Sequence, residues 1–263
     1  MDHKLIELNA EIEDRHWWFC ARRSILVDVV RHLLPSGPGS RVLDIGCGTG
    51  GNLAVLAEHF DCTGIDPAKV AIKFARERFP QIEFVRGSAP GDLRDLMPTF
   101  DLILMADVLA HVEFEIDMFS DIVAAAKPGS YFVLTVPANQ RMWSEHDVSH
   151  GHFRRYAPDR FAKIWEQLPV DRLFTSHFNW RLYPLIRTIR TLSQVRGASS
   201  GLHGSDLSVP NSIVNKMLYQ IFAGESSKLI QGLEQQSGPV STYGVSLLAV
   251  LQKQRAAELR KAA

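Results

Sequence analysis

Hydrophobic and polar positions follow two different periods along the central part of the chain. Short apolar runs that end at glycine, proline or an acidic residue alternate with longer stretches whose apolar positions recur at helical spacing. The short runs predict strands at 41–45, 61–65, 82–86, 101–105 and 130–136. The longer stretches predict helices at 51–59, 67–78 and 115–126. This alternation is typical of an α/β protein that carries helices around a mainly parallel sheet.

The segments on either side of this alternation are predicted to be mainly helical. Residues 4–34 carry apolar positions at helical spacing, and the proline- and glycine-rich segment 35–39 separates them from the first strand. Residues 158–168 predict a further helix. Between 181 and 238, two apolar stripes predict helices around a loop at 197–212, whose glycine- and serine-rich part at 197–204 predicts a mobile hinge.

The first strand runs directly into a cluster of glycines. The sequence R-V-L-D-I-G-C-G-T-G-G-N covers residues 41–52, and a helical pattern begins behind it. Glycines at such a turn let the backbone come close to a bound ligand, which a Cβ would block. The free N–H groups of the following helix point at the same ligand. We therefore expect a nucleotide-type pocket at the carboxyl end of this strand.

Two kinds of nucleotide compete for this pocket. Gly46, Gly48 and Gly51 fit the dinucleotide fingerprint G-x-G-x-x-G, with Asp66 as the ribose-binding acid, which would indicate an NAD-dependent oxidoreductase. The carboxylate of Asp44, at the end of the strand, would repel a pyrophosphate and instead suits a ligand with an ammonium group. A turn or capping role for Asp44 is the structural alternative.

Four motifs in order resemble those of the class I S-adenosylmethionine-dependent methyltransferases. They are V-L-D-I-G-C-G-T-G-G-N at 42–52, G-I-D-P at 64–67, F-D-L-I-L-M-A-D-V-L-A-H-V at 100–112 and K-P-G-S-Y-F-V-L-T-V-P at 127–137. The resemblance implies an α/β fold with a Rossmann-like, doubly wound seven-stranded sheet, mostly parallel with an antiparallel last strand. A helical N-terminal cap and a helical insertion would complete it. Segments 172–178 and 244–252 would form the closing antiparallel pair.

The resemblance also implies which residues bind S-adenosyl-L-methionine and its product S-adenosyl-L-homocysteine. The glycine loop would cradle the methionine half, Asp66 the ribose, and Asp107 would lie near the methyl group. Ser88 stands where the family often has an adenine-binding aspartate, and Ala110 where relatives often have a polar residue. The implied cofactor contacts are Asp44, Gly46, Cys47, Gly48, Gly50, Asn52, Asp66, Pro67, Ser88, Ala89, Ala106, Asp107 and Arg23.

The N-terminal stretch H-W-W-F-x-x-R-R, which begins at His16, places three large aromatic residues in succession. Successive helical residues point about 100° apart, so these rings cannot all face one core. Either the segment is a helix packed on the sheet, or it covers the cofactor as a lid. In the second case Arg22 or Arg23 would pair with the methionine carboxylate.

The segment 143–156, W-S-E-H-D-V-S-H-G-H-F-R-R-Y, gathers titratable groups just after a predicted strand. We expect His146 or His152 to act as a general base with Asp147 orienting an imidazole, since histidine's ordinary pKa of ~6.5 suits proton removal. A polar loop that anchors the next helix is the alternative, and the spacing indicates no metal site. The candidate substrate contacts are Trp18, His111, Arg154, Arg155 and Tyr156, of which the arginines would hold an anionic group.

Composition narrows the class of protein further. Lys and Arg together number 29, as do Asp and Glu, and this zero net charge argues against a nucleic-acid partner. Three cysteines without metal spacing favour a reduced, cytoplasmic setting. No apolar run is long enough for a transmembrane segment, and the acidic N-terminus is unlike a signal peptide.

These observations predict a methyltransferase that moves a methyl group to an oxygen or nitrogen of a small-molecule acceptor, which the arginines would suit if it is anionic. The alternatives are an NAD-dependent oxidoreductase and a non-catalytic S-adenosylmethionine-binding partner protein. The combination of H-W-W-F-x-x-R-R with H-D-x-x-x-G-H-x-R-R-Y resembles a bacterial branch of the family whose acceptors are largely unassigned.

The chain is expected to divide into three parts. These are an N-terminal helical cap at 1–39, a Rossmann-like methyltransferase domain at 40–180 and 239–263, and a helical insertion at 181–238 that acts as a lid on the acceptor site. The apolar stripes of the insertion suit the core or a homodimer contact, an apolar acceptor site, or a membrane surface that its arginines would favour.

Overall fold

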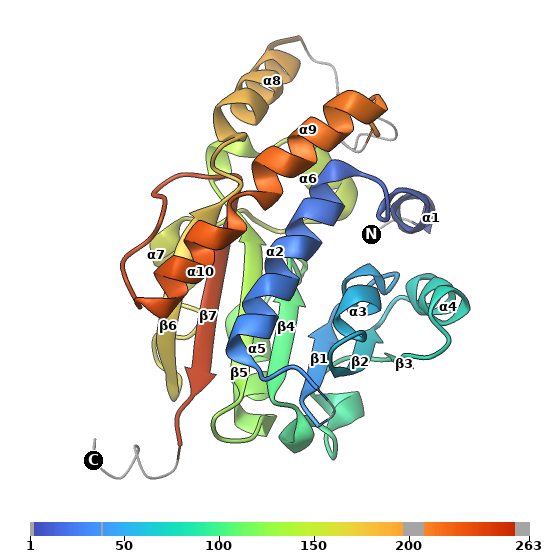
Figure 1. The fold of residues 1–263 in the computed structure, drawn as a ribbon, viewed down its shortest axis with the longest axis vertical. Helices are drawn as coiled ribbons and strands as arrows, with labels where there is room; N and C mark the ends of the chain where they lie inside the picture. The colour runs from blue at the N-terminus through green and yellow to red at the C-terminus, as the bar shows by residue number, and fades with distance from the viewer. Residues whose placement is uncertain (1–2, 38, 197–207, 256–263) are drawn as a thin grey trace.

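The computed structural model describes residues 3–37, 39–196 and 208–255, so the predicted hinge at 197–204 lies outside the described residues. A seven-stranded sheet in the order β3-β2-β1-β4-β5-β7-β6 forms the centre (Figure 1). β7 runs antiparallel to both of its neighbours, β5 and β6, while the other pairs are parallel. The predicted α/β fold class, with its antiparallel last strand, is confirmed.

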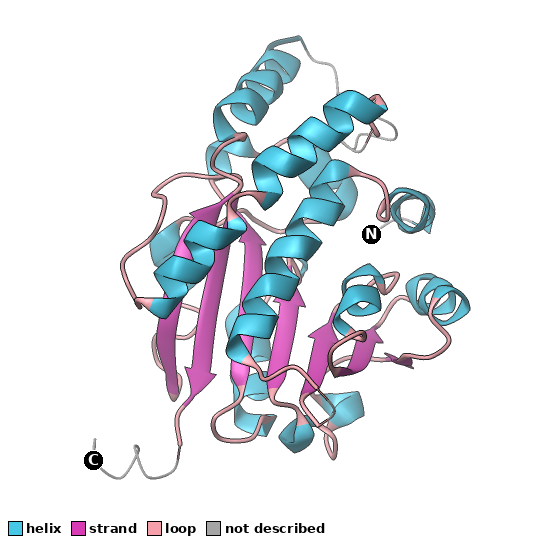
Figure 2. Cartoon of the chain, viewed as in Figure 1, coloured by secondary structure: helices cyan, strands magenta, loops and turns pink. Residues whose placement is uncertain are grey.

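All seven predicted strands are present, with small shifts at their ends. Their bounds are β1 (Arg41–Ile45), β2 (Asp61–Asp66), β3 (Glu83–Arg86), β4 (Leu102–Ala106), β5 (Tyr131–Pro137), β6 (Val170–Phe178) and β7 (Ser246–Lys253). Helices cover the sheet on both sides (Figure 2). They are α1 (His3–Ile12), α2 (Trp17–Leu33), α3 (Gly51–Leu56), α4 (Lys69–Arg78), α5 (Glu115–Ala125), α6 (Glu145–His150), α7 (Pro158–Ala162), α8 (Tyr183–Arg196), α9 (Ser212–Ala223) and α10 (Ser226–Glu234).

The core has two halves because successive residues of a strand point to opposite faces of the sheet. In β4, Leu102 and Leu104 pack with buried residues of α2, α3 and α10 on one face. Ile103 and Met105 of the same strand pack with buried residues of α5 and α7 on the other. Every position in β4 before its last residue is buried, as expected for a central parallel strand.

Two helix predictions and one loop prediction need correction. The helix predicted at 4–34 is two helices, because the chain turns after Ile12 and the imidazole of His16 caps α2 by accepting a hydrogen bond from the Trp18 N–H at 3.2 Å. The helix predicted at 158–168 ends at Ala162. Inside the segment predicted as a polar loop at 143–156, α6 forms, and Ser144 and Asp147 close its first turn as a capping box.

The second half of the predicted insertion lies against the sheet domain. Helices α9 and α10 pack along α2, and α10 also contacts β6. Phe222 of α9 is buried, with its ring centroid 5.8 Å from that of Phe178 and 6.2 Å from that of Trp17. This half therefore contributes to the core, and the division of the chain at 181–238 stays a prediction.

Candidate functional site

The strands β1, β2, β4 and β5 are mutually parallel, so their carboxyl ends meet at one edge of the sheet (Figure 1). The glycine loop follows β1 at this edge. Gly46, Gly48 and Gly50 have φ of +70°, +55° and +87°, in the left-handed region that other residues rarely adopt. A Cβ at Gly46 would lie 2.5 Å from Val108, whereas one at Gly48 would enter open space. The backbone of the loop is therefore uncovered at Gly48, and this leaves space for a ligand to approach it.

Asp44 lies fully buried beneath this loop. Among the described residues, neither of its carboxylate oxygens has a hydrogen-bond partner. Burial raises the pKa of Asp44 to about 7, while the nearby Asn52 amide and the charge of Arg22 lower it. A buried carboxylate whose neighbouring amide forms no well-aligned hydrogen bond with it is costly to the protein on its own. The arrangement fits a cationic group such as the ammonium of S-adenosylmethionine.

Asp66 ends β2 next to the same loop. Its carboxylate accepts hydrogen bonds from the backbone N–H of Gly48 at 3.0 Å and of Ala68 at 2.8 Å. Burial raises its pKa, and these two bonds lower it. Each carboxylate oxygen keeps a further acceptor position, so the side chain is fixed in place and still able to accept from ribose hydroxyls.

The remaining predicted cofactor residues differ in exposure. Cys47 is buried, and burial raises the pKa of its thiol far above the ordinary range. Pro67 is exposed at the end of β2, and Ala106 is half-buried at the end of β4. Ala89 is buried and Ser88 exposed.

Sequence reasoning missed Asp92 at this part of the edge. Its carboxylate accepts from the Ser88 N–H at 2.8 Å, and a Cβ at Gly87 would meet it at 2.5 Å. Asp92 therefore places a carboxylate next to Ser88, the position at which the family often has an adenine-binding aspartate. Asp92 lies in the turn S-A-P-G-D at 88–92, and no motif spacing in the sequence identifies it as a site residue.

The N-terminal segment lies against the glycine loop through Glu13, a buried residue between α1 and α2. The Glu13 carboxylate accepts from the hydroxyl of Thr49 at 2.6 Å and from the guanidinium of Arg78. Arg23 donates to the Glu13 carbonyl at 3.1 Å and lies 3.5 Å from the Asp14 carboxylate. Arg23, one of the two arginines predicted to meet the methionine carboxylate, is therefore held by Glu13 and Asp14 beside the glycine loop.

Arg22 and Trp18 reach the end of β4. The guanidinium of Arg22 pairs with the Asp107 carboxylate and lies 4.4 Å from the centroid of the Trp18 ring. Asp107 has a φ of +65°, a strained conformation that tends to mark functional sites. The hydroxyl of Thr135 donates to Asp107 at 3.2 Å and so fixes it to β5. Thr135 was not predicted, although it is a polar position in an otherwise apolar strand.

Four histidine rings cluster beside Asp107. Ring centroids lie 4.6 Å apart for His111 and His152, 4.0 Å for His146 and His150, and 6.0 Å for His150 and His152. Burial lowers the pKa of His111 to about 4 and that of His146 well below its ordinary value. Within the described residues, no group of three His, Cys, Asp or Glu side chains has the geometry of a metal site.

Asp147 organises this histidine cluster. Its fully buried carboxylate lies 2.9 Å from Nδ1 of His152 and accepts from Nε of Arg155 at 2.8 Å. Burial alone would raise the pKa of Asp147, but the contacts with His152 and Arg155 lower it strongly. Arg155 also donates to the Ala138 carbonyl at 3.1 Å, which ties the pair to the end of β5. The structure thus brings together Asp147 and His152, two residues predicted for catalysis.

The other two predicted substrate contacts are engaged within the fold. Arg154 pairs with the buried Glu115 and donates to the Val112 carbonyl at 2.9 Å. Tyr156 is fully buried and donates its hydroxyl to the Leu109 carbonyl at 3.0 Å. Both side chains fasten the segment after α6 to the segment after β4.

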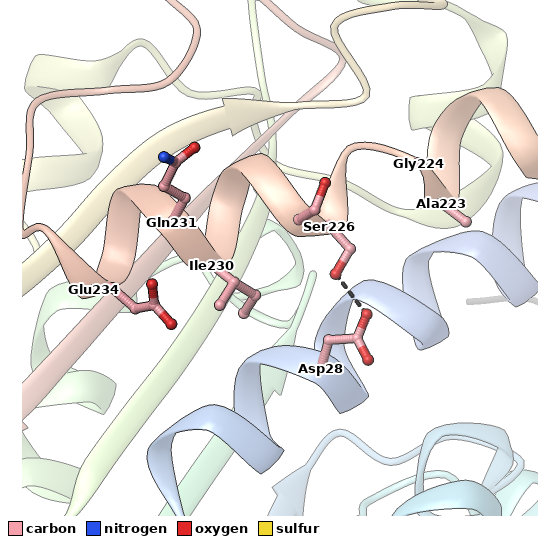
Figure 3. A pocket seen from close by; sticks show the side chains of 8 residues that line it. Asp28, Ala223, Gly224, Ser226, Ile230, Gln231 and Glu234 are labelled. Atoms are coloured by element: carbon pink, nitrogen blue, oxygen red, sulfur yellow. Dashed lines mark hydrogen bonds between the residues drawn. The ribbon is translucent and has the colours of Figure 1, made fainter.

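A separate groove lies between α2 and α10 (Figure 3). Asp28 and Ser226 face each other across it, with a hydrogen bond of 2.5 Å. Its other lining residues are Ala223, Gly224, Ser227, Ile230, Gln231 and Glu234. The groove shares no residue with the glycine loop or the histidine cluster, so it is not part of the candidate site.

The fold and the site together define a Rossmann-like methyltransferase. Residues 19–169 match the family model described as a methyltransferase domain, and the chain belongs to this family. The family and its homologues are S-adenosylmethionine-dependent methyltransferases, so S-adenosylmethionine is the cofactor. The sequence resemblance is confirmed at the level of the family, whereas the bacterial branch stays a prediction.

Similar proteins include a trans-aconitate 2-methyltransferase from Deinococcus radiodurans, 28% identical over 48% of this chain and 49% of its own length. A ubiquinone biosynthesis O-methyltransferase from Aliivibrio fischeri is 26% identical over 54% of this chain and 69% of its own length. The chain thus spans about half the length of the first of these relatives. A plantazolicin methyltransferase solved with S-adenosylhomocysteine shares the fold, with a TM-score of 0.57 and 16% identity over 96% of this chain and 90% of the other.

No described helix is long and apolar enough to cross a membrane.

Proposed function

We propose that this protein transfers a methyl group from S-adenosylmethionine to an oxygen of a small-molecule acceptor, with His152 as the general base. The observation that carries the proposal is the 2.9 Å contact between Nδ1 of His152 and the buried Asp147, beside the end of β4. An ionised Asp147 favours the tautomer with the proton on Nδ1, which leaves Nε2 as an acceptor. When bound, S-adenosylmethionine supplies an electrophilic methyl group and leaves as S-adenosylhomocysteine.

Different residues of the chain would bind the cofactor and remove the proton. Asp44 and the Gly48 backbone would hold the methionine half, and Asp66 would accept from the ribose. His152 would take the proton of an acceptor hydroxyl as its oxygen becomes bonded to the methyl carbon. Alignment in a site that excludes water supplies most of the acceleration in such a transfer. The low exposure of this cluster, in which His150 and Asp147 are buried and the other three histidines partly buried, supports such an environment.

The acceptor class is supported by the relatives. One relative is a trans-aconitate 2-methyltransferase and another is a ubiquinone biosynthesis O-methyltransferase. An oxygen acceptor fits a site that holds a base, and a nitrogen acceptor is the second candidate on the same geometry. The NAD-dependent alternative finds no support among the comparisons.

Helix α8 would form a wall of the acceptor site. Tyr183 at its start accepts from the Asn139 amide at 2.8 Å, and Arg190 donates to the Met142 carbonyl at 3.1 Å. Both partners belong to the segment between β5 and α6. The helix is thereby attached to the segment that leads into the histidine cluster.

The cofactor is tested by thermal unfolding with S-adenosylmethionine, S-adenosylhomocysteine, NAD and NADP in parallel. A ligand at 100 times its Kd adds about 2.7 kcal/mol of stability. For a chain of this size we expect a rise in Tm of roughly 5–10 °C with the two sulfur nucleotides alone. A rise with NAD alone would overturn the proposal.

The base is tested once an acceptor is found by screening for formation of S-adenosylhomocysteine. H152A should lower kcat by about 10²- to 10⁴-fold while the Kd for S-adenosylhomocysteine stays unchanged. H146A serves as the matched control in the same cluster. Loss of turnover in H146A but not in H152A would assign the base to the other histidine and refute the role of His152.

A further inference from the structure

The turn of residues 13–16, which joins α1 to α2, lies against the glycine loop. The Glu13 carboxylate accepts from the Thr49 hydroxyl at 2.6 Å, and a Cβ at Gly51 would lie 2.4 Å from the same carboxylate. The turn and the start of α3 are therefore in direct contact. Any movement of the turn changes how much of the glycine loop is covered.

Two side chains near the start of α2 extend this cover to the end of β4. The Arg22 guanidinium pairs with the Asp107 carboxylate and lies 4.4 Å from the centroid of the Trp18 ring. Its charge also lowers the pKa of Asp44, so it is close to both acidic residues that are predicted to meet the cofactor. Because Trp18 and Arg22 lie in the first two turns of α2, the position of that helix end sets the position of the cover.

The turn is held from the other side by Asn215, a half-buried residue of α9. Its Oδ1 accepts from the Trp17 N–H at 2.9 Å, and its Nδ2 donates to the Arg15 carbonyl at 2.7 Å. Trp17 is the first residue of α2, and the N–H of such a residue has no partner within its own helix. One partner is a donor and the other an acceptor, so the side chain that satisfies both needs the two functions of an amide.

A second contact joins the same turn to the segment that leads into α9 (Figure 1). The His16 imidazole accepts from the Trp18 N–H at 3.2 Å and also forms a hydrogen bond with the backbone of Ser208. Burial lowers the pKa of His16 to about 4, although the bond with Ser208 opposes this change. The ring is therefore neutral near neutral pH, as its acceptor role requires. The turn is thus attached to residues 208–215 at two places.

We propose that Asn215 is a positioning residue that holds the turn over the cofactor site. When both of its hydrogen bonds are made, Trp18 and Arg22 cover the edge of the sheet that carries the glycine loop. When they are lost, the turn moves away more readily and the cofactor dissociates faster. Within α9 an asparagine favours the helix less than alanine would, and Asn211 already caps it by accepting from the Val214 N–H at 3.0 Å. The effect on cofactor binding is independent of the proposed base.

The test compares N215A with N211A, two substitutions in one helix. N215A removes both hydrogen bonds to the turn, and the protein should remain folded because alanine favours the helix. The Kd for S-adenosylhomocysteine, measured by isothermal titration, should rise about tenfold, equivalent to about 1.4 kcal/mol. The dissociation rate in stopped-flow fluorescence should rise by a similar factor. N211A is the matched control: it should lower Tm by about 2–4 °C and leave the Kd unchanged.

Hydrogen exchange provides a second measurement. In the unaltered protein, S-adenosylhomocysteine should slow exchange at the backbone amides of residues 16–19, because the bound cofactor favours the held turn. The slowing should be smaller in N215A and unchanged in N211A. Three results would overturn the role of Asn215: an unchanged Kd in N215A, equal slowing of exchange in N215A and the unaltered protein, or a loss of affinity in N211A as large as in N215A. The last would mean that α9 acts through stability alone.

Discussion

Asp44 is the residue at which the cost of burying a charged group is most directly linked to the proposed binding of a cationic ligand. It is buried without a hydrogen-bond partner among the described residues, and its pKa is raised to about 7. In the unfolded chain the pKa returns to its ordinary value near ~3.9. Between these two values the unfolded state binds fewer protons, so the free energy of unfolding falls as pH rises from about 4 to 7. A cationic ligand beside Asp44 would relieve this cost.

The first prediction concerns the pH dependence of cofactor binding. Below pH 7 the free protein holds a proton on Asp44, and binding of a cationic ammonium group should release it. We expect the affinity for S-adenosylhomocysteine to rise about tenfold between pH 5.5 and 6.5, because one proton is released per ligand bound. Isothermal titration in buffers of different ionisation enthalpy measures both quantities. D44N should remove the slope, and an equal slope in D44N would contradict the assignment.

The second prediction concerns Gly48. Its φ is +55° and a Cβ there would meet nothing within 4 Å, so G48A adds backbone strain of about 1–2 kcal/mol without a clash inside the protein. The new methyl group would stand in the ligand cradle. We expect a weaker Kd for S-adenosylhomocysteine in addition to a lower Tm. Gly39, with a φ of +114° and equally open space, is the matched control. G39A should lower Tm alone, and equal Kd values for both variants would refute the cradle.

At the scale of elements, the junction between α1 and α2 is fastened to the glycine loop by a single carboxylate. Glu13 joins Thr49 at the start of α3 to Arg78 at the end of α4, and its own side chain is 10% exposed. Arg78 also pairs with the exposed Asp14 carboxylate at 2.5 Å, so Glu13 is the buried one of its two acidic partners. The position of the N-terminal segment should therefore be sensitive to this one residue.

The third prediction follows from that contact. E13Q should lower the free energy of unfolding by about 2 kcal/mol in urea titrations, because Thr49 and Arg78 lose a buried charged acceptor while Arg78 keeps the Asp14 carboxylate at 2.5 Å. E11Q is the control: Glu11 pairs with Arg15 at 2.8 Å, but both side chains are mostly exposed. That change should stay within about 0.5 kcal/mol. Similar losses in the two variants would mean that Glu13 does not fasten the segment.

The first five strands were predictable from the sequence because each is an apolar run that a glycine, a proline or an acidic residue brings to an end, whereas the last two were implied by the family resemblance. Helix α10 was not predictable, since it is short and Gly232 in its last turn lowers helix propensity. The structure gives the reason for that glycine. A Cβ there would lie 2.8 Å from the ring of Phe174, so its absence lets α10 approach β6. Such a reason depends on tertiary packing and leaves no local signal.

The candidate site was predictable to a similar extent. The glycine loop, Asp44 and Asp66 belong to the motifs at 42–52 and 64–67, and the spacing of these motifs indicates a nucleotide site. The pairs Arg22–Asp107 and His111–His152 join residues far apart in sequence, and only the fold brings them together. The sequence contains the histidines of this cluster, but it does not show which of them Asp147 contacts.

At the scale of the whole molecule, α9 and α10 complete the face of the sheet that α2 covers. Phe222 is 1% exposed and lies between α2 and β6 through its contacts with Trp17 and Phe178. Residues on both sides of the segment 197–207 therefore belong to one core. Removal of the segment 208–238 would expose that core rather than detach a module.

The fourth prediction tests this integration. F222A should lower the free energy of unfolding by about 3–5 kcal/mol, the usual effect of replacing a buried phenylalanine with alanine. I213A changes an 80% exposed residue of the same helix and should stay within about 0.5 kcal/mol. Denaturant unfolding followed by tryptophan fluorescence measures both. A small loss in F222A would show that α9 folds apart from the sheet.

The three cysteines of the chain differ in exposure, with a practical consequence. Burial raises the thiol pKa of all three, but Cys47 and Cys62 are only 6% exposed, whereas Cys20 is half-buried and lies 3.7 Å from the Glu13 carbonyl. A maleimide dye should therefore attach to the unaltered protein at Cys20 first. The dye would stand at the junction of α1 and α2, beside the glycine loop. Its emission would report cofactor arrival in real time, without engineering a single-cysteine variant.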